Sequence, residues 1–375
     1  MKFVGFGRIV SNQLIFLAFG VPEGRRGRPL AGFQDRCIQP LCHTSNDRKC
    51  IKSAHNPGVQ TSTTAPLQAS AESSLSANRA ATVVAVAGAT GTIGQAVFKR
   101  LAERGYHPVA LPRDPQCLPA GCSAVISCMA SRTGLAEDAW RVDHQAQSKL
   151  LSLARQQGVD QFVLLSAICV QKPHLPFQKA KLAFEAELQA SGLRYCIVRP
   201  TAFFKSLAGQ LKRVLAGKPF LVFGDGQLTR CKPISDEDLA DYLIDCLNHP
   251  DRVNQILPIG GPGPALSPMD QVHLLEGLLG HRVRIKSVPV GLLRSIAGLL
   301  SVAGWFSKAA RDKAELARIG LYYATESMLV WDESAGAYSE SLTPETGQQR
   351  LADFYASVIR GETRVDLGAH AVFKD

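Results

Sequence analysis

Apolar and polar positions alternate along the chain in a pattern of buried strands and amphipathic helices. Residues 83–87 form an apolar run of β-branched and small residues, which is typical of a strand buried on both faces of a parallel sheet. Residues 95–103 then place apolar side chains on one helical face and charged ones on the other. Similar strand-like or helical patterns follow at 106–114, 124–128, 140–157, 162–166, 176–190 and 195–201. This alternation predicts a doubly wound parallel α/β sheet.

The second half of the chain continues with shorter elements. They are strands at 220–223 and 256–259 and a last amphipathic helix at 351–359. Ser235 and Ser267 each precede a helical pattern, and Pro268 follows the second of them. Serine is a favoured N-cap and proline is favoured at the first helical position, so we expect both serines to cap helices.

The apolar stretch 288–306 differs from the rest. It is shorter than the ~20 residues that cross a bilayer and contains Arg294, so we do not expect it to span a membrane. We expect it to form a pocket wall, with a lid or a helix on a membrane surface as alternatives. The chain should therefore divide into a sheet domain, residues 80–263, and a smaller, mostly helical substrate-binding or lid region, residues 264–375.

Three glycines at a spacing of three follow the first strand. Gly88 permits a tight turn, Gly91 lets a pyrophosphate approach the backbone, and Gly94 allows the helix to pack closely on the strand. The helix N-terminus then faces the phosphates. The residues expected to contact the cofactor here are Gly88, Thr90, Gly91, Thr92, Ile93 and Gly94. A glycine-rich turn without a ligand is the alternative, but the flanking strand and helix favour a Rossmann-like, NAD(P)-binding domain.

The end of the second strand bears on the choice of cofactor. In a Rossmann-like sheet this position lies beside the adenosine ribose, and an acidic residue there binds the 2′-hydroxyl of NAD. This chain has Arg113 instead, which suits a 2′-phosphate and predicts NADPH. The alternative is an arginine in a solvated turn.

Charge is concentrated at the N-terminus. The net charge is +10 over 375 residues, yet residues 1–78 alone hold nine Lys and Arg against four acids. Arg-rich and Ser/Thr-rich stretches with few acids are typical of an organelle transit peptide, so we expect residues 1–79 to be a plastid leader. A mitochondrial leader and a secretory signal are the alternatives. The remaining sequence lacks basic-aromatic repeats, and no nucleic-acid partner is predicted.

Cysteine usage indicates a reducing compartment. The ten cysteines include no C-x-x-C pair and form no disulfide framework. Cys128, Cys169 and Cys196 lie in or beside apolar strand-like runs, where cysteine commonly serves as a small buried hydrophobe. No metal site is predicted.

Several longer stretches carry a family resemblance. They are residues 162–173, 177–188, 199–207, 223–226, 231–235, 257–263 and 319–329. Together with the glycine loop they resemble the NmrA-like, atypical short-chain dehydrogenase/reductases, and within these the divinyl chlorophyllide a 8-vinyl-reductases of plants and algae. The resemblance covers about residues 83–354. The glycine loop is weakly specific, whereas the block 165–173 and the Tyr322-Tyr323 block are far more so.

The resemblance implies a reaction and a compartment. The expected reaction is NADPH-dependent reduction of the 8-vinyl group of a magnesium-containing divinyl tetrapyrrole, chlorophyllide or protochlorophyllide, to ethyl during chlorophyll biosynthesis in chloroplasts. Peripheral association with a thylakoid or envelope membrane is compatible with such an enzyme. Alternatives are a different double-bond reductase of the isoflavone-reductase kind and a dinucleotide-binding protein without turnover.

The catalytic helix departs from the broader superfamily. A Tyr-x-x-x-Lys pair there protonates a carbonyl oxygen, whereas this chain has Phe177 and Lys181 at that spacing. The missing phenol argues against ketone chemistry and is compatible with vinyl reduction. We expect Lys181 to hold the nicotinamide ribose and to supply positive charge. The alternative is an exposed lysine paired with Glu185 one turn on.

Other site residues are expected at strand ends and on a late helix. Ser166 follows a buried strand and is expected to contact cofactor or substrate. Tyr322 and Tyr323 are candidates for donating the proton or for stacking on the macrocycle, with ordinary packing as the alternative. The residues expected to line the nicotinamide side are Pro200, Thr201, Ala202 and Phe203.

The chain is shorter than this family between the second and third strands. Only nine residues, 115–123, follow Asp114, which can cross about 30 Å but cannot hold a covering helix. About forty residues, including an edge strand and two helices, are absent from this region of the sequence. We expect uncovered apolar sheet surface, lower stability and weaker NADPH binding. A skipped exon in the gene model is the alternative explanation.

Overall fold

The computed structural model describes residues 82–365. The expected leader, residues 1–79, lies outside the described residues. Residues 82–365 all fall within one compact unit, and the boundary expected at residue 263 stays a prediction.

A six-stranded parallel sheet forms the centre of the described residues. Its strand order is β2-β1-β3-β4-β5-β7. The strands are β1 (Val83–Ala87), β2 (His107–Ala110), β3 (Cys122–Ser127), β4 (Gln161–Leu165), β5 (Arg194–Pro200) and β7 (Gln255–Ile259). In register, Val84 of β1 pairs with Pro108 on one side and Ala124 on the other. The predicted Rossmann-like parallel sheet is confirmed.

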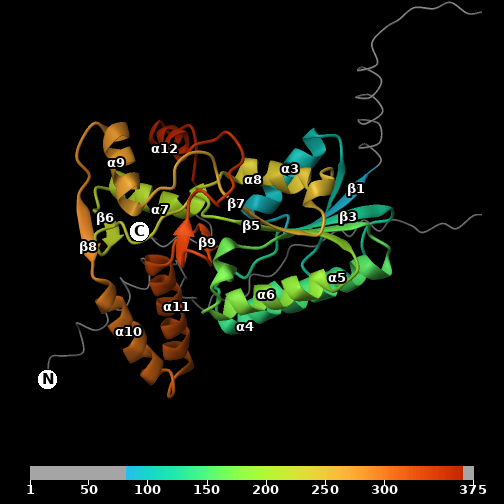
Figure 1. Cartoon of the computed structure of the whole chain (residues 1–375), viewed down its shortest axis with the longest axis horizontal. Coiled ribbons are helices and arrows are strands. Elements are labelled where there is room, and N and C mark those ends of the chain that lie inside the picture. The colour runs from blue at the N-terminus through green and yellow to red at the C-terminus, as the bar shows by residue number, and fades with distance from the viewer. Residues whose placement is uncertain (1–81, 366–375) are drawn as a thin grey trace, which may run out of the picture. The chain divides into compact units, whose positions relative to one another are not determined.

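Helices cover both faces of this sheet (Figure 1). They are α3 (Thr92–Glu103) and α8 (Asp236–Asp245) on one face, and α5 (Gln147–Gln156) and α6 (Pro176–Gln189) on the other. Val84 and Val86 of β1 pack toward α3 and α8, whereas Ala85 and Ala87 pack toward α5 and α6. This is the alternation of a strand that is buried on both faces.

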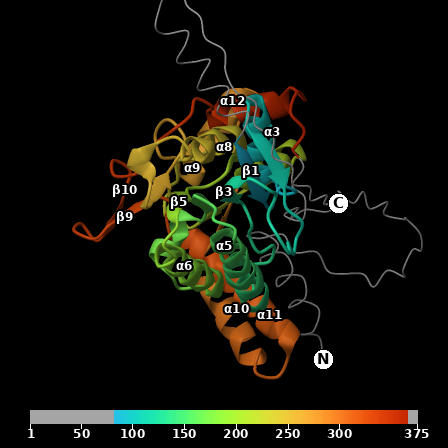
Figure 2. The same ribbon diagram turned by 90° about the vertical axis from the view of Figure 1, so that its right-hand side faces the viewer.

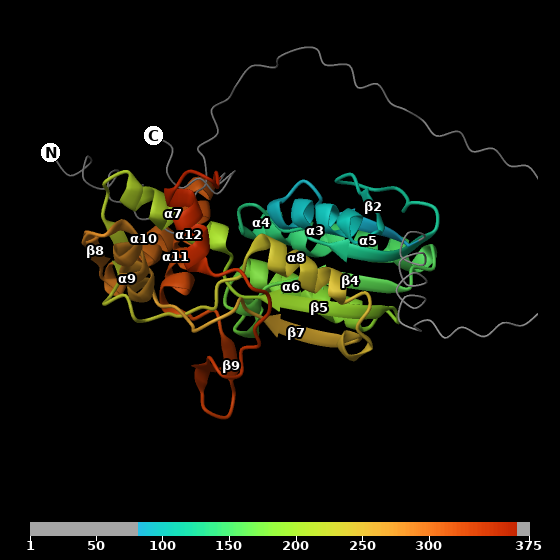
Figure 3. The same cartoon turned by 90° about the horizontal axis from the view of Figure 1, so that it is seen from above.

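Most of the remaining elements lie beyond the carboxyl ends of the strands (Figure 3). They are α4 (Ala136–Ala139), η1 (Trp140–Ala146), η2 (Ile168–Gln171), α7 (Phe204–Leu215), β6 (Phe220–Phe223), α9 (Pro268–Leu279), β8 (Ile285–Val288), α10 (Val290–Ala303), α11 (Lys308–Thr325), β9 (Val330–Asp332), β10 (Ala337–Ser339) and α12 (Leu351–Ile359), with η1 π-helical and η2 3₁₀-helical. The 3₁₀-helical η3 (Pro250–Arg252) lies between α8 and the start of β7. Strand β6 pairs in parallel with β8, and a separate apolar core joins α7, α9 and α12.

Both predicted serine caps are confirmed. The Ser235 hydroxyl accepts the amide of Asp238 at 3.0 Å, and the Ser267 hydroxyl accepts the amide of Asp270 at 3.1 Å. The Asp270 carboxylate in turn accepts the backbone amide of Ser267 at 2.8 Å, which completes a capping box. These local sequence signals therefore set where α8 and α9 begin.

The short connection between β2 and β3 covers the sheet without a helix. Residues 111–121 pass from β2 to β3, and Leu118 of this segment is only 4% exposed. Leu118 packs in the same core as Ala85 and Val125, which are both fully buried. Its backbone amide is bonded to the side chain of Gln157 at 2.6 Å. The expectation of uncovered apolar surface is thus wrong for this face of β1 and β3, where Leu118 packs in one core with side chains of α5 and α6.

The stretch 288–306 forms the end of β8, helix α10 and the turn into α11. Only Leu293 and Ala297 of α10 are buried. Trp305 and Phe306, at the turn, are 82% and 86% exposed. The pocket wall expected here stays a prediction.

Replacing Leu118 by alanine tests the role of the connection. We expect the free energy of unfolding to fall by about 2–4 kcal/mol, because the change leaves a cavity against Ala85 and Val125. Denaturant unfolding measures the difference, and the neighbouring Cys117→Ala, at an exposed position, is the matched control. Equal stability of both variants would show that the connection does not seal the sheet.

Candidate functional site

The first part of the site is the turn between β1 and α3. Gly88 has φ +75°, and a Cβ added there would lie 2.8 Å from the carbonyl oxygen of Cys128. A Cβ on Gly94 would lie 2.2 Å from the carbonyl oxygen of Gly88. Only glycine fits at either position, because helix and strand approach so closely. The geometry that the spacing predicted for these two glycines is present.

This turn has the features of an anion cradle. Gly91 is the N-cap of α3 and uses no side chain for capping, and its own amide is bonded to the carbonyl of Gly88 at 2.9 Å. The first turn of a helix presents amide groups without intrahelical partners, at the positive end of the helix dipole. A close backbone approach of this kind fits the pyrophosphate of a dinucleotide. The direct contacts of Thr90, Thr92 and Ile93 stay a prediction.

Lys205 is a residue that the sequence analysis missed. Its ammonium group donates to the hydroxyl of Thr92 at 2.8 Å, although the two residues are 113 positions apart. Lys205 lies in the first turn of α7, directly after the loop that leaves β5. The structure therefore adds a positive charge beside the glycine loop. The stretch 199–207 was the available sequence signal, but nothing in it pointed to this contact.

Arg113 lies where the second strand leaves the sheet. It is exposed, and it lines a small cavity of about 20 Å³ together with Ala87 and Met129. The same cavity is bordered by Asp114 and Lys149, whose carboxylate and ammonium groups are 2.5 Å apart. These two side chains tie the short connection to α5. The contact of Arg113 with the adenosine end of a cofactor stays a prediction.

Lys181 occupies a buried and charged position on α6. Its side chain is 12% exposed, and its ammonium group lies 3.0 Å from Oδ1 of Asp143, whose side chain is fully buried. The backbone amide of Ser131 also donates to Oδ1 at 3.2 Å. The alternative pairing of Lys181 with Glu185 is wrong. Asp143 was not foreseen, because a single aspartate in a helical pattern carries no spacing signal.

Asp143 lies in the π-helical segment η1, which interrupts the helix running from α4 to α5. Single π-helical turns commonly mark functional positions, because they rotate a side chain out of the regular helical pattern. The second carboxylate oxygen of Asp143, Oδ2, is buried and has no hydrogen-bond partner. An unpaired buried carboxylate oxygen is costly, so it is an acceptor available to a ligand at this position.

Ser166 belongs to a second buried network. Its hydroxyl donates to Glu185, and the Glu185 carboxylate also pairs with the guanidinium of Arg199. The Glu185 side chain is 1% exposed and that of Arg199 is 17% exposed. Ser166 thus lies at the carboxyl end of β4 as predicted, but its hydroxyl points to α6. Glu185 and Arg199 are further residues that the sequence analysis did not assign.

The two tyrosines lie against the same helix as Lys181. Tyr322 and Tyr323 of α11 share an apolar cluster with Phe177 and Cys169. The Tyr322 hydroxyl donates to the carbonyl of Cys169 at 2.9 Å, and the Tyr323 hydroxyl is 3.8 Å from the Cys169 sulfur. Desolvation raises the pKa of both phenols, so they stay protonated at neutral pH. Burial likewise raises the pKa of the Cys169 thiol, which keeps it neutral.

The loop after β5 completes the edge of the site. Thr201 is buried, and its hydroxyl donates to the carbonyl of Lys232. The amide of Ile234 donates to the carbonyl of Ala202 at 2.9 Å, and Phe203 forms a bridge with Ile234. These bonds hold Pro200–Phe203 beside the ends of β5 and β7. Their contact with a nicotinamide stays a prediction.

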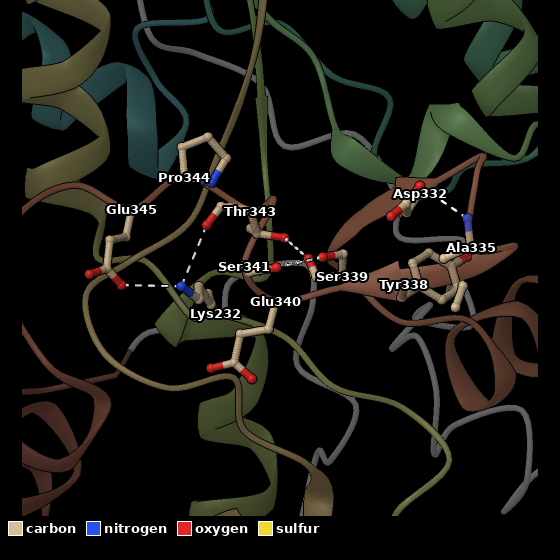
Figure 4. Close-up of a pocket in the computed structure, with 11 residues that line it drawn as sticks. Lys232, Asp332, Ala335, Tyr338, Ser339, Glu340, Ser341, Thr343, Pro344 and Glu345 are labelled. Atoms are coloured by element: carbon tan, nitrogen blue, oxygen red, sulfur yellow. Dashed lines mark hydrogen bonds and ion pairs between the residues drawn. The ribbon is translucent and has the colours of Figure 1, made fainter.

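A larger cavity, of about 870 Å³, lies next to this loop (Figure 4). It is lined by Lys232, the β9–β10 hairpin and the segment that follows it. The Lys232 ammonium group donates to the Thr343 carbonyl at 3.4 Å and to Glu345 at 3.2 Å. Asp332 and Glu340 add further carboxylates to the lining. The wall is mixed, because Ala335, Ala337 and Tyr338 lie beside these charged groups.

Residues of the motif 162–173 hold this hairpin in place. The Gln171 side chain bonds to the Leu329 carbonyl at 2.6 Å and to the Trp331 amide at 2.8 Å. The Lys172 ammonium group lies 4.0 Å from the centre of the Trp331 ring and 3.0 Å from Glu326. The long specific block recognised in the sequence therefore has a structural role, which is to join η2 to β9.

Comparison with known proteins shows the family of the chain. The family model described as NAD(P)H-binding matches residues 118–250. The chain is 40% identical to the protein named divinyl chlorophyllide a 8-vinyl-reductase, chloroplastic, of Cucumis sativus, over 92% of each chain. It is 43% identical to the protein of the same name from Oryza sativa subsp. indica, over 78% of this chain and 82% of that one.

The alignment with the cucumber protein also measures the shortening. It extends over 388 positions, whereas 92% of this chain is about 345 residues, so about forty positions have no counterpart here. This agrees in size with the segment missing after Asp114. Among solved structures, the NADPH complex of the quinone oxidoreductase QOR2 from Escherichia coli matches 74% of this chain and 99% of its own, with a TM-score of 0.50 and 15% identity. That likeness shows the fold alone.

Gly94→Ala tests the close approach of α3 and β1. We expect NADPH affinity to fall at least about tenfold and stability to decrease, because the added Cβ meets the carbonyl of Gly88 and must push the helix away. Titration of NADPH fluorescence and thermal unfolding measure the two effects. The matched control is Gly209→Ala in α7, where an added Cβ meets nothing within 4 Å. Unchanged NADPH binding by the Gly94 variant would contradict the assignment of the cradle.

Proposed function

The chain belongs to the divinyl chlorophyllide a 8-vinyl-reductases, and we propose that it reduces the 8-vinyl group of divinyl chlorophyllide a to ethyl, using NADPH, in the chloroplast. The observation that carries this proposal is the identity of 40–43% to reductases of that name over most of the chain. Peripheral contact with a thylakoid or envelope membrane is part of the proposal. Among residues 82–365, no helix is both long and apolar enough to cross a bilayer.

The cradle, Arg113 and Lys205 hold the dinucleotide in this proposal. The turn from Gly88 to Gly94 takes the pyrophosphate, since its glycines let the N-terminus of α3 approach the end of β1 closely. Lys205 neutralises phosphate charge from the opposite side of the turn. Arg113 takes the 2′-phosphate, which distinguishes NADPH from NADH. When bound, NADPH supplies the hydride.

Lys181 and Asp143 form the centre of the reaction site. A lysine ammonium group has three donors, and one of them is directed to Asp143. Two remain for the hydroxyls of the nicotinamide ribose. The buried Asp143 carboxylate fixes the position of the ammonium group, so its positive charge is already in place when charge develops in the substrate.

The substrate needs a hydride and a proton at adjacent carbons. The hydride adds to the terminal vinyl carbon and leaves negative charge spread over the macrocycle, and the inner carbon then takes the proton. No carbonyl oxygen requires a phenol, which accounts for Phe177 at the position of the superfamily tyrosine. Tyr322 and Tyr323 lie in the same cluster as Phe177 and are the proposed proton donor or stacking surface. Ser166 positions Glu185 and Arg199 beneath the site.

Single-turnover absorbance tests the proposed function. We expect the full chain, mixed with NADPH and divinyl chlorophyllide a, to shift the Soret band to shorter wavelength, because conversion of vinyl to ethyl shortens the conjugated system. Omission of NADPH is the control. A chain that binds NADPH but gives no shift, beside an active version with the missing segment restored, would contradict activity of this shortened chain. If neither protein shifts the Soret band, the proposal that divinyl chlorophyllide a is the substrate is contradicted.

Lys181→Met tests the role of the ammonium group. We expect turnover to fall about 100-fold or more, since a neutral side chain neither binds the ribose nor stabilises developing negative charge. Circular dichroism checks that the variant folds. Lys179→Met, at an exposed position of the same helix, is the control and should keep its turnover. A Lys181 variant as active as the control would remove Lys181 from the mechanism.

A further inference from the structure

Helices α10 and α11 form a hairpin whose turn is strongly apolar and exposed. Figures 1 and 2 show the hairpin projecting beyond the helices that flank the sheet. Its large exposed apolar side chains are Leu292, Leu299, Val302, Trp305 and Phe306. Trp305 and Phe306 are 82% and 86% exposed, the largest fractions among the large hydrophobic residues described. We call these five residues the apolar tip.

The residues of the apolar tip lie outside the buried face of α10. Leu293 and Ala297 form the buried side of α10, and Leu293 packs with Val288 and Ala324. Leu292, Leu299 and Val302 are spaced seven and three residues apart, so they share one side of α10 that faces away from that contact. The helix thus already has its internal packing face, and it carries a second apolar face toward the outside.

Basic residues outnumber acidic ones around the apolar tip. Between Val290 and Arg311 the chain contains Arg294, Lys308 and Arg311 but no acidic residue. Further along α11, Lys313 and Arg318 are accompanied by Asp312 and Glu315, so residues 290–318 hold five basic and two acidic side chains. Lys308 forms an ion pair with Glu137 at 3.2 Å, and both side chains are more than 70% exposed. Such an exposed pair is weak and leaves the local field positive.

We propose that the apolar tip inserts into the surface of an anionic lipid bilayer. An amphipathic element with tryptophan and phenylalanine on one side and arginine and lysine beside them matches the boundary between lipid headgroups and acyl chains. Its basic residues attract anionic headgroups. The hairpin enters only this boundary, since none of the described helices is apolar and long enough to cross.

The same hairpin reaches the reaction site. Helix α11 begins at Lys308, next to the tip, and carries Tyr322 and Tyr323 near its other end. Its 18 residues make a rod of about 27 Å. The membrane contact is thereby held at a set distance from the two tyrosines. This inference specifies the peripheral membrane association of the proposed function, and it does not depend on the reductase activity.

Vesicle sedimentation with the full chain tests the inference. The probes are vesicles of phosphatidylcholine with about 30% phosphatidylglycerol and vesicles of phosphatidylcholine alone. We expect binding to the anionic vesicles, weakened severalfold by 0.5 M salt, and a loss of at least about tenfold in affinity for the double variant Trp305→Ser/Phe306→Ser. The matched control is Leu228→Ser/Leu342→Ser, which removes two exposed apolar side chains elsewhere and should bind like the unaltered chain.

Two further readouts separate the possible outcomes. Brominated acyl chains should quench tryptophan fluorescence in the unaltered chain more than in the Trp305→Ser variant. Equal vesicle binding by the tip variant and the control would overturn the inference. A second result would also overturn it: the unaltered chain binds no vesicles but self-associates in light scattering, and the tip variant does not. The apolar tip would then pack against a second copy of the chain. Turnover with detergent-dispersed substrate should be the same in the tip variant and the unaltered chain. If the proposed reduction does not occur, both proteins will lack turnover, whatever their vesicle binding.

Discussion

Two buried charges on helix α6 set the arrangement of the whole site. Lys181 and Glu185 lie one turn apart, which in an exposed helix would let them pair with each other. Here each is removed from water, and removal of a charge from water costs several kcal/mol unless a partner and hydrogen bonds replace the lost solvation. Lys181 finds Asp143 on η1, and Glu185 finds Arg199 on β5. Three elements are therefore fixed relative to one another by two ion pairs.

This arrangement gives the π-helical segment a physical reason. A regular helix from α4 to α5 would turn Asp143 away from α6, whereas the wider turn of η1 brings its carboxylate to the ammonium group of Lys181. One carboxylate oxygen is left buried without a partner. A purely structural ion pair gains nothing from an unsatisfied oxygen, so the network is better suited to a site that receives ligand hydroxyls.

The shortened sheet stays closed over β1 and β3. No helix lies between β2 and β3, and Leu118 of the connection packs in one core with Ala85, Val125 and side chains of α5 and α6. The pair of Asp114 and Lys149 ties the same connection to α5. The apolar tip of α10 and α11 differs from this closed face, because its apolar side chains are exposed and no other described residue covers them.

The sequence by itself determined the features that depend on neighbouring residues. The order of strands and helices, the caps at Ser235 and Ser267, and the glycines at 88 and 94 follow from local periodicity and backbone freedom, so they could be predicted. The tertiary structure decided the partners of Lys181 and Ser166, the contact of Lys205 with Thr92, the seal made by Leu118 and the exposure of Trp305. Each of these depends on residues brought together from distant positions in the chain, where burial and desolvation select one partner among many. Local pattern carries no information about that choice.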